Sequence, residues 1–181
     1  MTGPRIGAAI LLLLLAVGAW KAPPAPDTGQ LVWDLIRFRG PDPWVDAAFQ
    51  LMGVWPMLYA RILLAGTGRT WLPKLLALAG FFIGAFALMP AIMTRRFGAS
   101  TKDDPSWVRF FCRSPWVGAI VALSGFGLLS YGFWFGDPRS ALTAWREHGF
   151  VWIFGLDFCA LSLGFLLLLL GERQAAENPA V

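Results

Sequence analysis

Long apolar runs separated by short charged connections dominate this chain of 181 residues. Five runs approach the roughly 20 residues that a helix needs to cross a hydrocarbon core of about 30 Å. None shows the strict alternation of a barrel strand. The pattern predicts an all-α integral membrane protein with a bundle of five transmembrane helices, at residues 6–20, 44–64, 75–93, 116–135 and 150–171.

The first run leaves the number of helices open at five or four. It is short, and the lone Arg5 before it and the "VGA" at 17–19 are also typical of a cleavable signal peptide. Cleavage would place the basic connection 94–115 outside the cell, against the positive-inside rule. We therefore expect the first run to be retained as a helix.

Two connections carry short amphipathic patterns. Residues 30–39 place Leu31 and Leu35 on one helical face, and "DDPSWVRFFCR" offers Asp104 as an N-cap with Pro105 at the first helical position. We expect two short interfacial helices, with plain loops as the alternative. The chain then divides into a first helix or signal peptide (1–20), a Pro-rich linker with an interfacial helix (21–43), a four-helix transmembrane domain (44–171) and a polar C-terminal tail (172–181).

Composition agrees with a membrane location. Hydrophobic residues make up 57% of the chain, and its mean hydropathy is +0.59, more than a soluble core of this size needs. Tryptophans gather near the ends of the runs, as expected of side chains that settle at lipid head groups. They are Trp20, Trp44, Trp71, Trp116, Trp134 and Trp152.

The charged residues argue against several classes of partner and cofactor. The net charge is +4, but the basic residues lie between apolar runs, where they contact anionic lipid rather than nucleic acid. One histidine and two cysteines provide no zinc or paired-histidine haem spacing, and we expect no metal or other cofactor. We also expect Cys112 and Cys159 not to form a disulfide.

Lysines and arginines in alternate connections set the expected orientation. With five helices, one side collects six basic residues and the other collects nine. The positive-inside rule then predicts an N-terminus outside the cell and a C-terminus in the cytoplasm.

Asp157 is the most informative residue, because it lies inside the last apolar run, roughly 10 Å below the start of its helix. Five alternating helices would bring Asp157 into the same half of the bilayer as Arg61. The sequence therefore predicts that Asp157 pairs with Arg61, and that Tyr59 or Tyr131 supplies a hydroxyl.

Two further polar residues, Asp46 and Gln50, share the helix face of Arg61, and complete the predicted intramembrane polar cluster. The cluster has three interpretations: a structural lock between helices, a proton or ion relay, or a carboxylate that reaches toward water. Pairs of small residues are expected to let helices pack closely. They are Gly80 with Gly84, and Ala160 with Gly164.

Three stretches resemble a family of small, uncharacterised membrane proteins known from cyanobacteria, other bacteria and chloroplasts. They are "FQLMGVWPMLYARILLAG", "GAFALMPAIMTRR" and "FGLDFCALSLGFLLLLLGERQ". The resemblance covers most of residues 40 to 174. It implies an integral protein of a bacterial inner membrane or a photosynthetic membrane, with no assigned activity and no catalytic residues.

The chain contains no catalytic triad, paired acidic motif or nucleotide fingerprint. We therefore expect a non-catalytic accessory or structural component of a membrane complex, whose partners are the lipid bilayer and other membrane subunits or a second copy. The alternatives are a small transporter or channel component that uses Asp157 and Arg61, and a membrane enzyme.

Overall fold

The computed structural model describes residues 3–25, 27–66, 70–102 and 104–177. Within these residues the chain forms nine helices and no strand. Four helices are long: α1 (Gly3–Trp20), α3 (Pro43–Leu63), α7 (Pro115–Phe135) and α9 (Gly149–Glu177). The shorter ones are α2 (Thr28–Ile36), α4 (Leu72–Ile83), α5 (Ala85–Thr94), α6 (Ser106–Arg113) and α8 (Pro138–Glu147).

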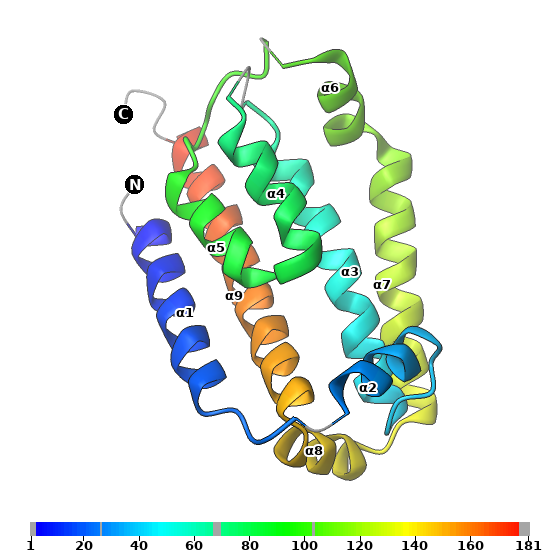
Figure 1. Cartoon of the computed structure of the whole chain (residues 1–181). Helices are drawn as coiled ribbons and strands as arrows, with labels where there is room; N and C mark the ends of the chain where they lie inside the picture. Colours follow the sequence, from blue (N-terminus) through cyan, green and yellow to red (C-terminus); the bar gives the residue numbers. More distant parts are fainter. Residues whose placement is uncertain (1–2, 26, 67–69, 103, 178–181) are drawn as a thin grey trace.

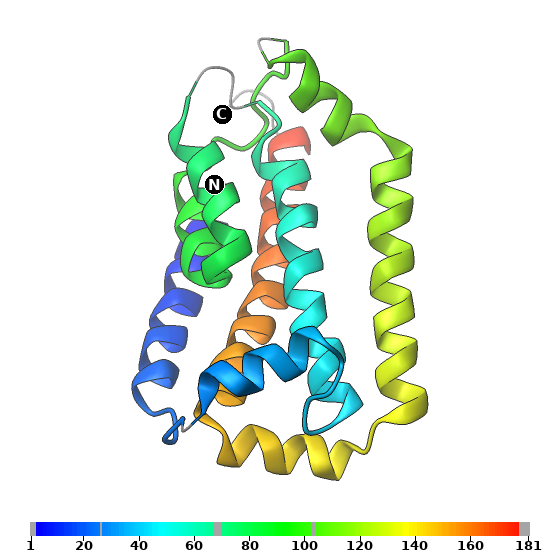
Figure 2. The same cartoon turned by 45° about the vertical axis from the view of Figure 1, so that its right-hand side comes forward.

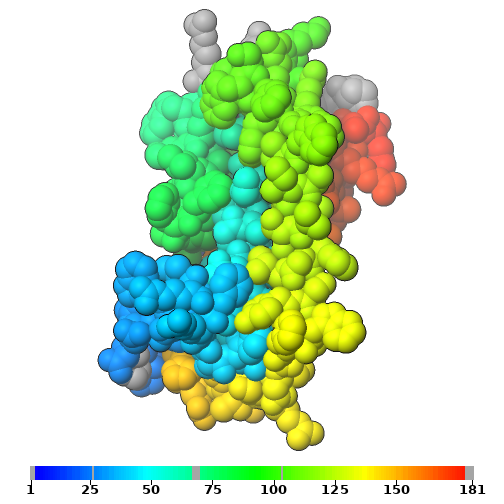
Figure 3. All heavy atoms as spheres, turned by 90° about the vertical axis from the view of Figure 1, so that its right-hand side faces the viewer, coloured from blue at the N-terminus to red at the C-terminus, as the bar shows by residue number. Residues whose placement is uncertain are grey.

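The long helices run side by side along the long axis of the molecule (Figure 1). α9 packs between α1 and α3, whereas α7 packs mainly against α3. The main core includes the fully buried Tyr59, Leu88 and Leu161, from three different helices. In the space-filling view, α7 runs along one face from α6 to α8 (Figure 3).

Three of the long helices, α1, α7 and α9, are long and apolar enough to cross a membrane. The sequence-based assignment to an all-helical protein compatible with a membrane location is therefore confirmed at this level. The helix over the second apolar run, α3, has 21 residues, the same length as α7. Its interior contains Pro56, and its first turn contains Asp46.

The third apolar run does not form one continuous helix. It is divided at Gly84 into α4 and α5, which fold back on each other as a helical hairpin (Figure 2). Gly84 has φ 55° and ψ −130°, a backbone conformation that L side chains rarely adopt. The start of α4 and the end of α5 line one cavity, which includes Leu72 and Thr94. The prediction of a single helix over 75–93 is thus wrong, because the chain reverses at a glycine near the middle of the run.

This reversal changes the direction of every later helix. The start of α1 and the end of α9 lie at the same end of the bundle (Figure 1), where Arg5 Nη2 donates to the backbone oxygen of Arg95 at 2.8 Å, and Arg95 contacts Glu172. The prediction of five crossings places these two ends of the chain on opposite sides, whereas the structure has them at one end of the bundle. We call this the basic end; it holds the start of α1, the end of α3, α6 and the end of α9.

The opposite end holds α2 and α8, which lie across the ends of the long helices (Figure 2). Trp152 Nε1 donates to Gly18 O at 2.9 Å there, which joins α9 to α1. α8 was not expected from the apolar pattern. Its signal is nevertheless present in the sequence, because Asp137 caps the helix and accepts from Arg139 N, and Pro138 occupies the first turn.

Short helices, α2 and α6, form in the two connections where amphipathic helices were expected, and their location at a membrane interface stays a prediction. α6 begins one residue later than expected, with Pro105 as its N-cap. Asp104 instead accepts a hydrogen bond from Gly66 N at 2.7 Å, which fixes the connection between α3 and α4 to the one before α6. The expected C-terminal tail continues α9 as far as Glu177.

α1 is an integral part of the bundle. Ala8 and Leu15 are buried in the main core, and α1 packs on both α5 and α9. Added Cβ atoms at Gly7 and Gly18 would meet Leu167 and Leu156 of α9, so the two helices approach closely at both positions.

Candidate functional site

The tip of the α4–α5 hairpin rests on Asp157. The backbone N–H of Ala85, the first residue of α5, donates to Asp157 Oδ1 at 2.7 Å. The first N–H groups of a helix have no partner within the helix, and its N-terminus carries a partial positive charge. Asp157 therefore acts as an N-cap for α5, supplied by a different helix.

Gly84 makes this contact possible. A Cβ atom added at Gly84 would overlap the carboxylate of Asp157. The turn also requires the positive φ of this residue, so two independent constraints favour glycine at the tip. The second oxygen, Asp157 Oδ2, is buried and has no hydrogen-bond partner among the described residues.

A cavity of about 420 Å³ lies beside the hairpin tip. Its polar lining includes Gln50 and Asp157. Otherwise it is aromatic and aliphatic, and six phenylalanines contribute to it: Phe49, Phe81, Phe82, Phe86, Phe150 and Phe154. Asp157 therefore lies at the margin of an apolar space rather than in a chain of polar groups.

The predicted ion pair between Asp157 and Arg61 is not formed in the described structure. Arg61 Nη2 instead donates to Cys112 O and Ser114 O, each at 3.1 Å, at the C-terminal end of α6. The physical reason is the hairpin. Because α4 and α5 reverse the chain, Arg61 lies near the basic end, whereas Asp157 lies nearer the opposite end.

Helical rise gives the scale of this separation. Asp157 is eight residues from the start of α9, about 12 Å above the opposite end. Arg61 is eighteen residues from the start of α3, about 27 Å above that end. About 15 Å along the bundle axis therefore separates two residues that a five-helix topology would bring together.

The other members of the predicted cluster have separate partners. Tyr59 is fully buried, and its hydroxyl donates to Leu161 O of α9 at 2.6 Å. Tyr131 packs against Phe38 and Phe135, with ring centroids 5.7 Å apart in both pairs. Tyr59 thus belongs to the α3–α9 contact, and Tyr131 to the region around the end of α2.

Asp46 and Gln50 fix the connection between α2 and α3. Asp46 Oδ1 accepts from Gly40 N at 3.0 Å, and Gln50 Nε2 donates to Leu35 O at 2.9 Å. The polar face expected along α3 is therefore divided between two tasks, because its start holds α2 and its end, at Arg61, holds α6.

The small-residue pairs have different roles. A Cβ atom added at Gly164 would meet Met89 of α5 and Tyr59 of α3, and Ala160 is buried on the same side of α9. At Gly80 it would meet Leu88, so Gly80 lets the two arms of the hairpin pack together. Gly84 forms the turn itself.

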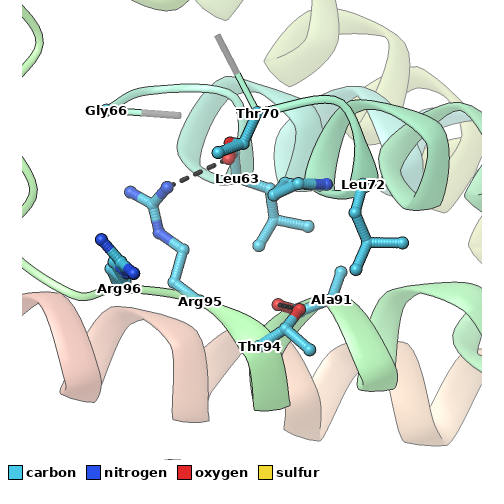
Figure 4. Close-up of a pocket in the computed structure, with 9 residues that line it drawn as sticks. Leu63, Gly66, Thr70, Leu72, Ala91, Thr94, Arg95 and Arg96 are labelled. Atoms are coloured by element: carbon cyan, nitrogen blue, oxygen red, sulfur yellow. Dashed lines mark hydrogen bonds between the residues drawn. The ribbon is translucent and has the colours of Figure 1, made fainter. Parts of the chain in front are cut away.

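Arg95 is a central contact at the basic end that the sequence did not single out. It is 6% exposed and forms an ion pair with Glu172 at 2.9 Å. Its Nη1 also donates to Leu63 O and Ala65 O, and Figure 4 shows the side chain reaching from the end of α5 toward Leu63. Arg95 thereby ties the hairpin to both α3 and α9. In the sequence, the role of Arg95 is indicated only by the segment "TRRFG", which looks like the basic residues that ordinarily follow a membrane helix.

Arg95 also lines a cavity of about 260 Å³, together with Thr94 and Arg96 at the end of α5 and Thr70 and Leu72 at the start of α4 (Figure 4). Among the residues described, no group of three or more His, Cys, Asp or Glu side chains is placed to hold a metal ion. Cys112 and Cys159 are both free thiols.

Comparison with known proteins finds no match to a family model, to a curated protein or to a solved structure. The resemblance to a family of small membrane proteins remains a prediction from the three quoted stretches of sequence.

Proposed function

We propose that this chain is an integral membrane protein that crosses the bilayer four times, through α1, α3, α7 and α9. α3 has 21 residues, about 32 Å of helix, which matches a hydrocarbon core of about 30 Å. The two arms of the hairpin, with 12 and 10 residues, measure about 18 Å and 15 Å. Each arm spans only half of the core, so the hairpin enters from the basic end and returns to it.

The basic end faces the cytoplasm in this proposal. Of the described residues, nine lysines and arginines belong to that end and five to the other. The nine are Arg5, Arg61, Lys74, Arg95, Arg96, Lys102, Arg109, Arg113 and Arg173. The five are Lys21, Arg37, Arg39, Arg139 and Arg146. The positive-inside rule supports a cytoplasmic location for both termini, in a bacterial inner membrane or a photosynthetic membrane.

Within this membrane the protein acts without catalysis, as an accessory or structural component of a larger complex. One observation carries this proposal: three polar side chains of the apolar interior, those of Asp157, Tyr59 and Arg61, are each bound to the chain's own backbone. Asp157 accepts a hydrogen bond from Ala85 N, and Tyr59 donates one to Leu161 O. Arg61 donates to two carbonyl oxygens at the end of α6. A relay or catalytic site needs side chains whose reactive atoms face a common point, whereas these side chains each fix a pair of helices.

A small transporter or channel component is the second candidate. The observation that favours it is the hairpin, because discontinuous helices whose ends lie within the bilayer are typical of transporters. The six phenylalanines around the adjacent cavity favour the accessory role instead, since an ion pathway needs polar or water-filled surroundings.

Purification of the full chain from its native membrane in a mild detergent separates the two candidates. A membrane subunit that copurifies in a fixed ratio is the expected result for an accessory protein. Copurification of nothing but further copies of this chain, together with proton or ion flux in liposomes that Asp157→Asn abolishes, would instead establish the transporter. Matched liposomes without protein provide the flux background.

A further inference from the structure

A third cavity, of about 390 Å³, lies at the basic end between α3, α6 and α9. α6 contributes Arg109 and Arg113, α3 contributes Arg61 and Ile62, and α9 contributes Leu169 and Glu172. This cavity is separate from the one at the hairpin tip, and none of the contacts of Asp157 takes part in it.

The lining of the cavity has an excess of positive charge. Four guanidinium groups line it against two carboxylates, Asp104 and Glu172. The Arg95–Glu172 pair is neutral as a unit, with 2.9 Å between its charged atoms. Arg61, Arg109 and Arg113 then face Asp104 alone, which leaves a net charge of +2. Arginine binds phosphate oxygens well, because its planar donors match their geometry.

The two arginines of α6 are placed for an external ligand. Arg109 and Arg113 are one helical turn apart, and both are exposed. Arg113 Nη2 donates to Thr101 Oγ1 at 3.1 Å, which directs it across the cavity. On the same helix, the exposed aromatic side chains Trp107 and Phe110 lie at other positions around the axis. α6 therefore combines a basic face with an aromatic one, as a helix at the head-group level does.

Apolar side chains take part in the lining, and the long helices on either side of α6 and the cavity expose further apolar side chains. Ile62 and Leu169 form part of its lining, and α7 begins directly after α6, at Pro115. Further along, α9 exposes Leu166 and α7 exposes Leu123. A ligand with a phosphate beside α6 and a hydrocarbon part along α7 and α9 would match both surfaces.

We propose that this cavity binds an anionic glycerophospholipid, with its phosphate between Arg109, Arg113 and Arg61 and its acyl chains against α7 and α9. The proposal rests on the membrane arrangement given above, which puts the cavity at the cytoplasmic head-group level. A free phosphate would use the same guanidinium groups, but it would leave the adjoining apolar surface unused. Basic pockets between membrane helices on the cytoplasmic side are known to bind anionic head groups.

The test is a lipid titration of the purified full chain, followed by native mass spectrometry. Dioleoyl phosphatidylglycerol and dioleoyl phosphatidylcholine carry the same acyl chains and differ in net head-group charge. We expect phosphatidylglycerol to bind about tenfold more tightly, and inorganic phosphate at the same concentration not to compete. Equal binding of the two lipids would overturn the proposal. Full competition by inorganic phosphate would show a free-anion site instead.

Paired variants locate the site. Replacing both arginines of α6, by Arg109→Gln and Arg113→Gln, should weaken phosphatidylglycerol binding roughly 10- to 30-fold. The control, Arg139→Gln with Arg146→Gln on α8, removes the same charge from exposed positions at the opposite end and should change binding less than about twofold. Equal losses in the two double variants would refute a defined site.

Further measurements separate a failure of the lipid proposal from poor folding of the variant and from a failure of the proposed function. The wild-type preference between the two lipids decides the proposal even if the α6 variant folds poorly. A missing partner subunit would count against the accessory role and leave the lipid result standing, whereas a wrong membrane arrangement would be detected by cysteine labelling of the two ends.

Discussion

The carboxylate of Asp157 on α9 accepts a hydrogen bond from the backbone N–H of Ala85, at the tip of a hairpin formed 72 residues earlier in the chain. This contact explains why a carboxylate lies in an apolar helix. It satisfies an N–H group that a helix beginning inside the bundle cannot bond within itself, and its negative charge faces the positive end of α5.

The first prediction distinguishes a cap from an ion pair at Asp157. Asparagine keeps a side-chain oxygen that can accept from Ala85 N and is itself a good N-cap, so Asp157→Asn should lower the free energy of unfolding by less than about 1 kcal/mol. Asp157→Leu removes the acceptor and should cost about 1–3 kcal/mol. Thermal unfolding in detergent measures both.

Glu147→Leu, at an exposed carboxylate of α8, is the control for the change in charge and hydrophobicity, and it should have little effect. Losses of similar size for Asp157→Asn and Asp157→Leu would contradict the capping role and point back to a charged partner.

The second prediction concerns the turn at Gly84. Alanine there would meet both the positive φ of 55° and the carboxylate of Asp157. Gly84→Ala should therefore destabilise the protein by about 1–3 kcal/mol. Gly53→Ala is the matched control, because Gly53 lies inside α3 and has no neighbour within 4 Å of an added Cβ. Alanine has the better helix propensity, so stability there should be unchanged or slightly higher.

The hairpin also marks the limit of what the sequence alone could predict. Apolar runs and tryptophan positions predict the four long helices well, because hydrophobicity and helix length are local properties. They do not reveal a reversal inside an apolar run, since both arms are as apolar as a crossing helix. Gly84 and Pro90 are the only local hints, and isolated glycine and proline also occur in membrane helices that cross completely.

The incorrect topology also led to an incorrect partner for Asp157. Five alternating crossings would place Arg61 and Asp157 in the same half of the bilayer, and their opposite charges then favour the prediction of an ion pair. The structure gives each residue backbone partners of its own, which no sequence pattern indicates. The importance of Asp157 could be predicted from the sequence, because an unpaired carboxylate in an apolar helix is energetically unfavourable. Its partner could not be predicted, because it depends on the tertiary fold.

The third prediction addresses the basic end. Arg95 is 6% exposed and bonds two carbonyl oxygens as well as Glu172, so Arg95→Gln leaves three acceptors without a charged donor. We expect Arg95→Gln to lower the free energy of unfolding by about 2–4 kcal/mol. The side chain of Glu172 is 28% exposed. Glu172→Gln should lower the free energy of unfolding by less, because Arg95 keeps its hydrogen bonds to Leu63 O and Ala65 O.

The pair Arg173–Glu177 on the same helix provides the matched control. Its charged atoms are 2.8 Å apart, close to the 2.9 Å of Arg95–Glu172, but its side chains are 77% and 57% exposed. Arg173→Gln should therefore change stability by less than about 0.5 kcal/mol. Equal effects of Arg95→Gln and Arg173→Gln in denaturation experiments would show that Arg95 is not a structural clamp.

The fourth prediction is that Tyr59→Phe destabilises the protein without altering its topology. The Tyr59 hydroxyl is fully buried and donates to Leu161 O at 2.6 Å, and loss of this bond should cost about 1 kcal/mol. Tyr131→Phe, at a half-buried residue, serves as the comparison and should be close to neutral. A larger effect at Tyr131 in thermal unfolding would contradict the assignment of Tyr59 to the α3–α9 contact.

The most direct test of the re-entrant hairpin is whether the start of α1 and the end of α9 lie on the same side of the membrane. Cys112→Ser and Cys159→Ser remove the two native thiols. Single cysteines are then introduced by Gly3→Cys or Gly29→Cys, where an added Cβ has open space, or by Ala176→Cys, at an exposed position near the end of α9. Intact cells are treated with a membrane-impermeant maleimide, with permeabilised cells as the control for reactivity. A hairpin that enters and leaves on one side predicts that Gly29→Cys is labelled in intact cells, and that Gly3→Cys and Ala176→Cys are both labelled only after permeabilisation. Labelling of only one of Gly3→Cys and Ala176→Cys in intact cells would place the two ends on opposite sides of the membrane and would contradict this account.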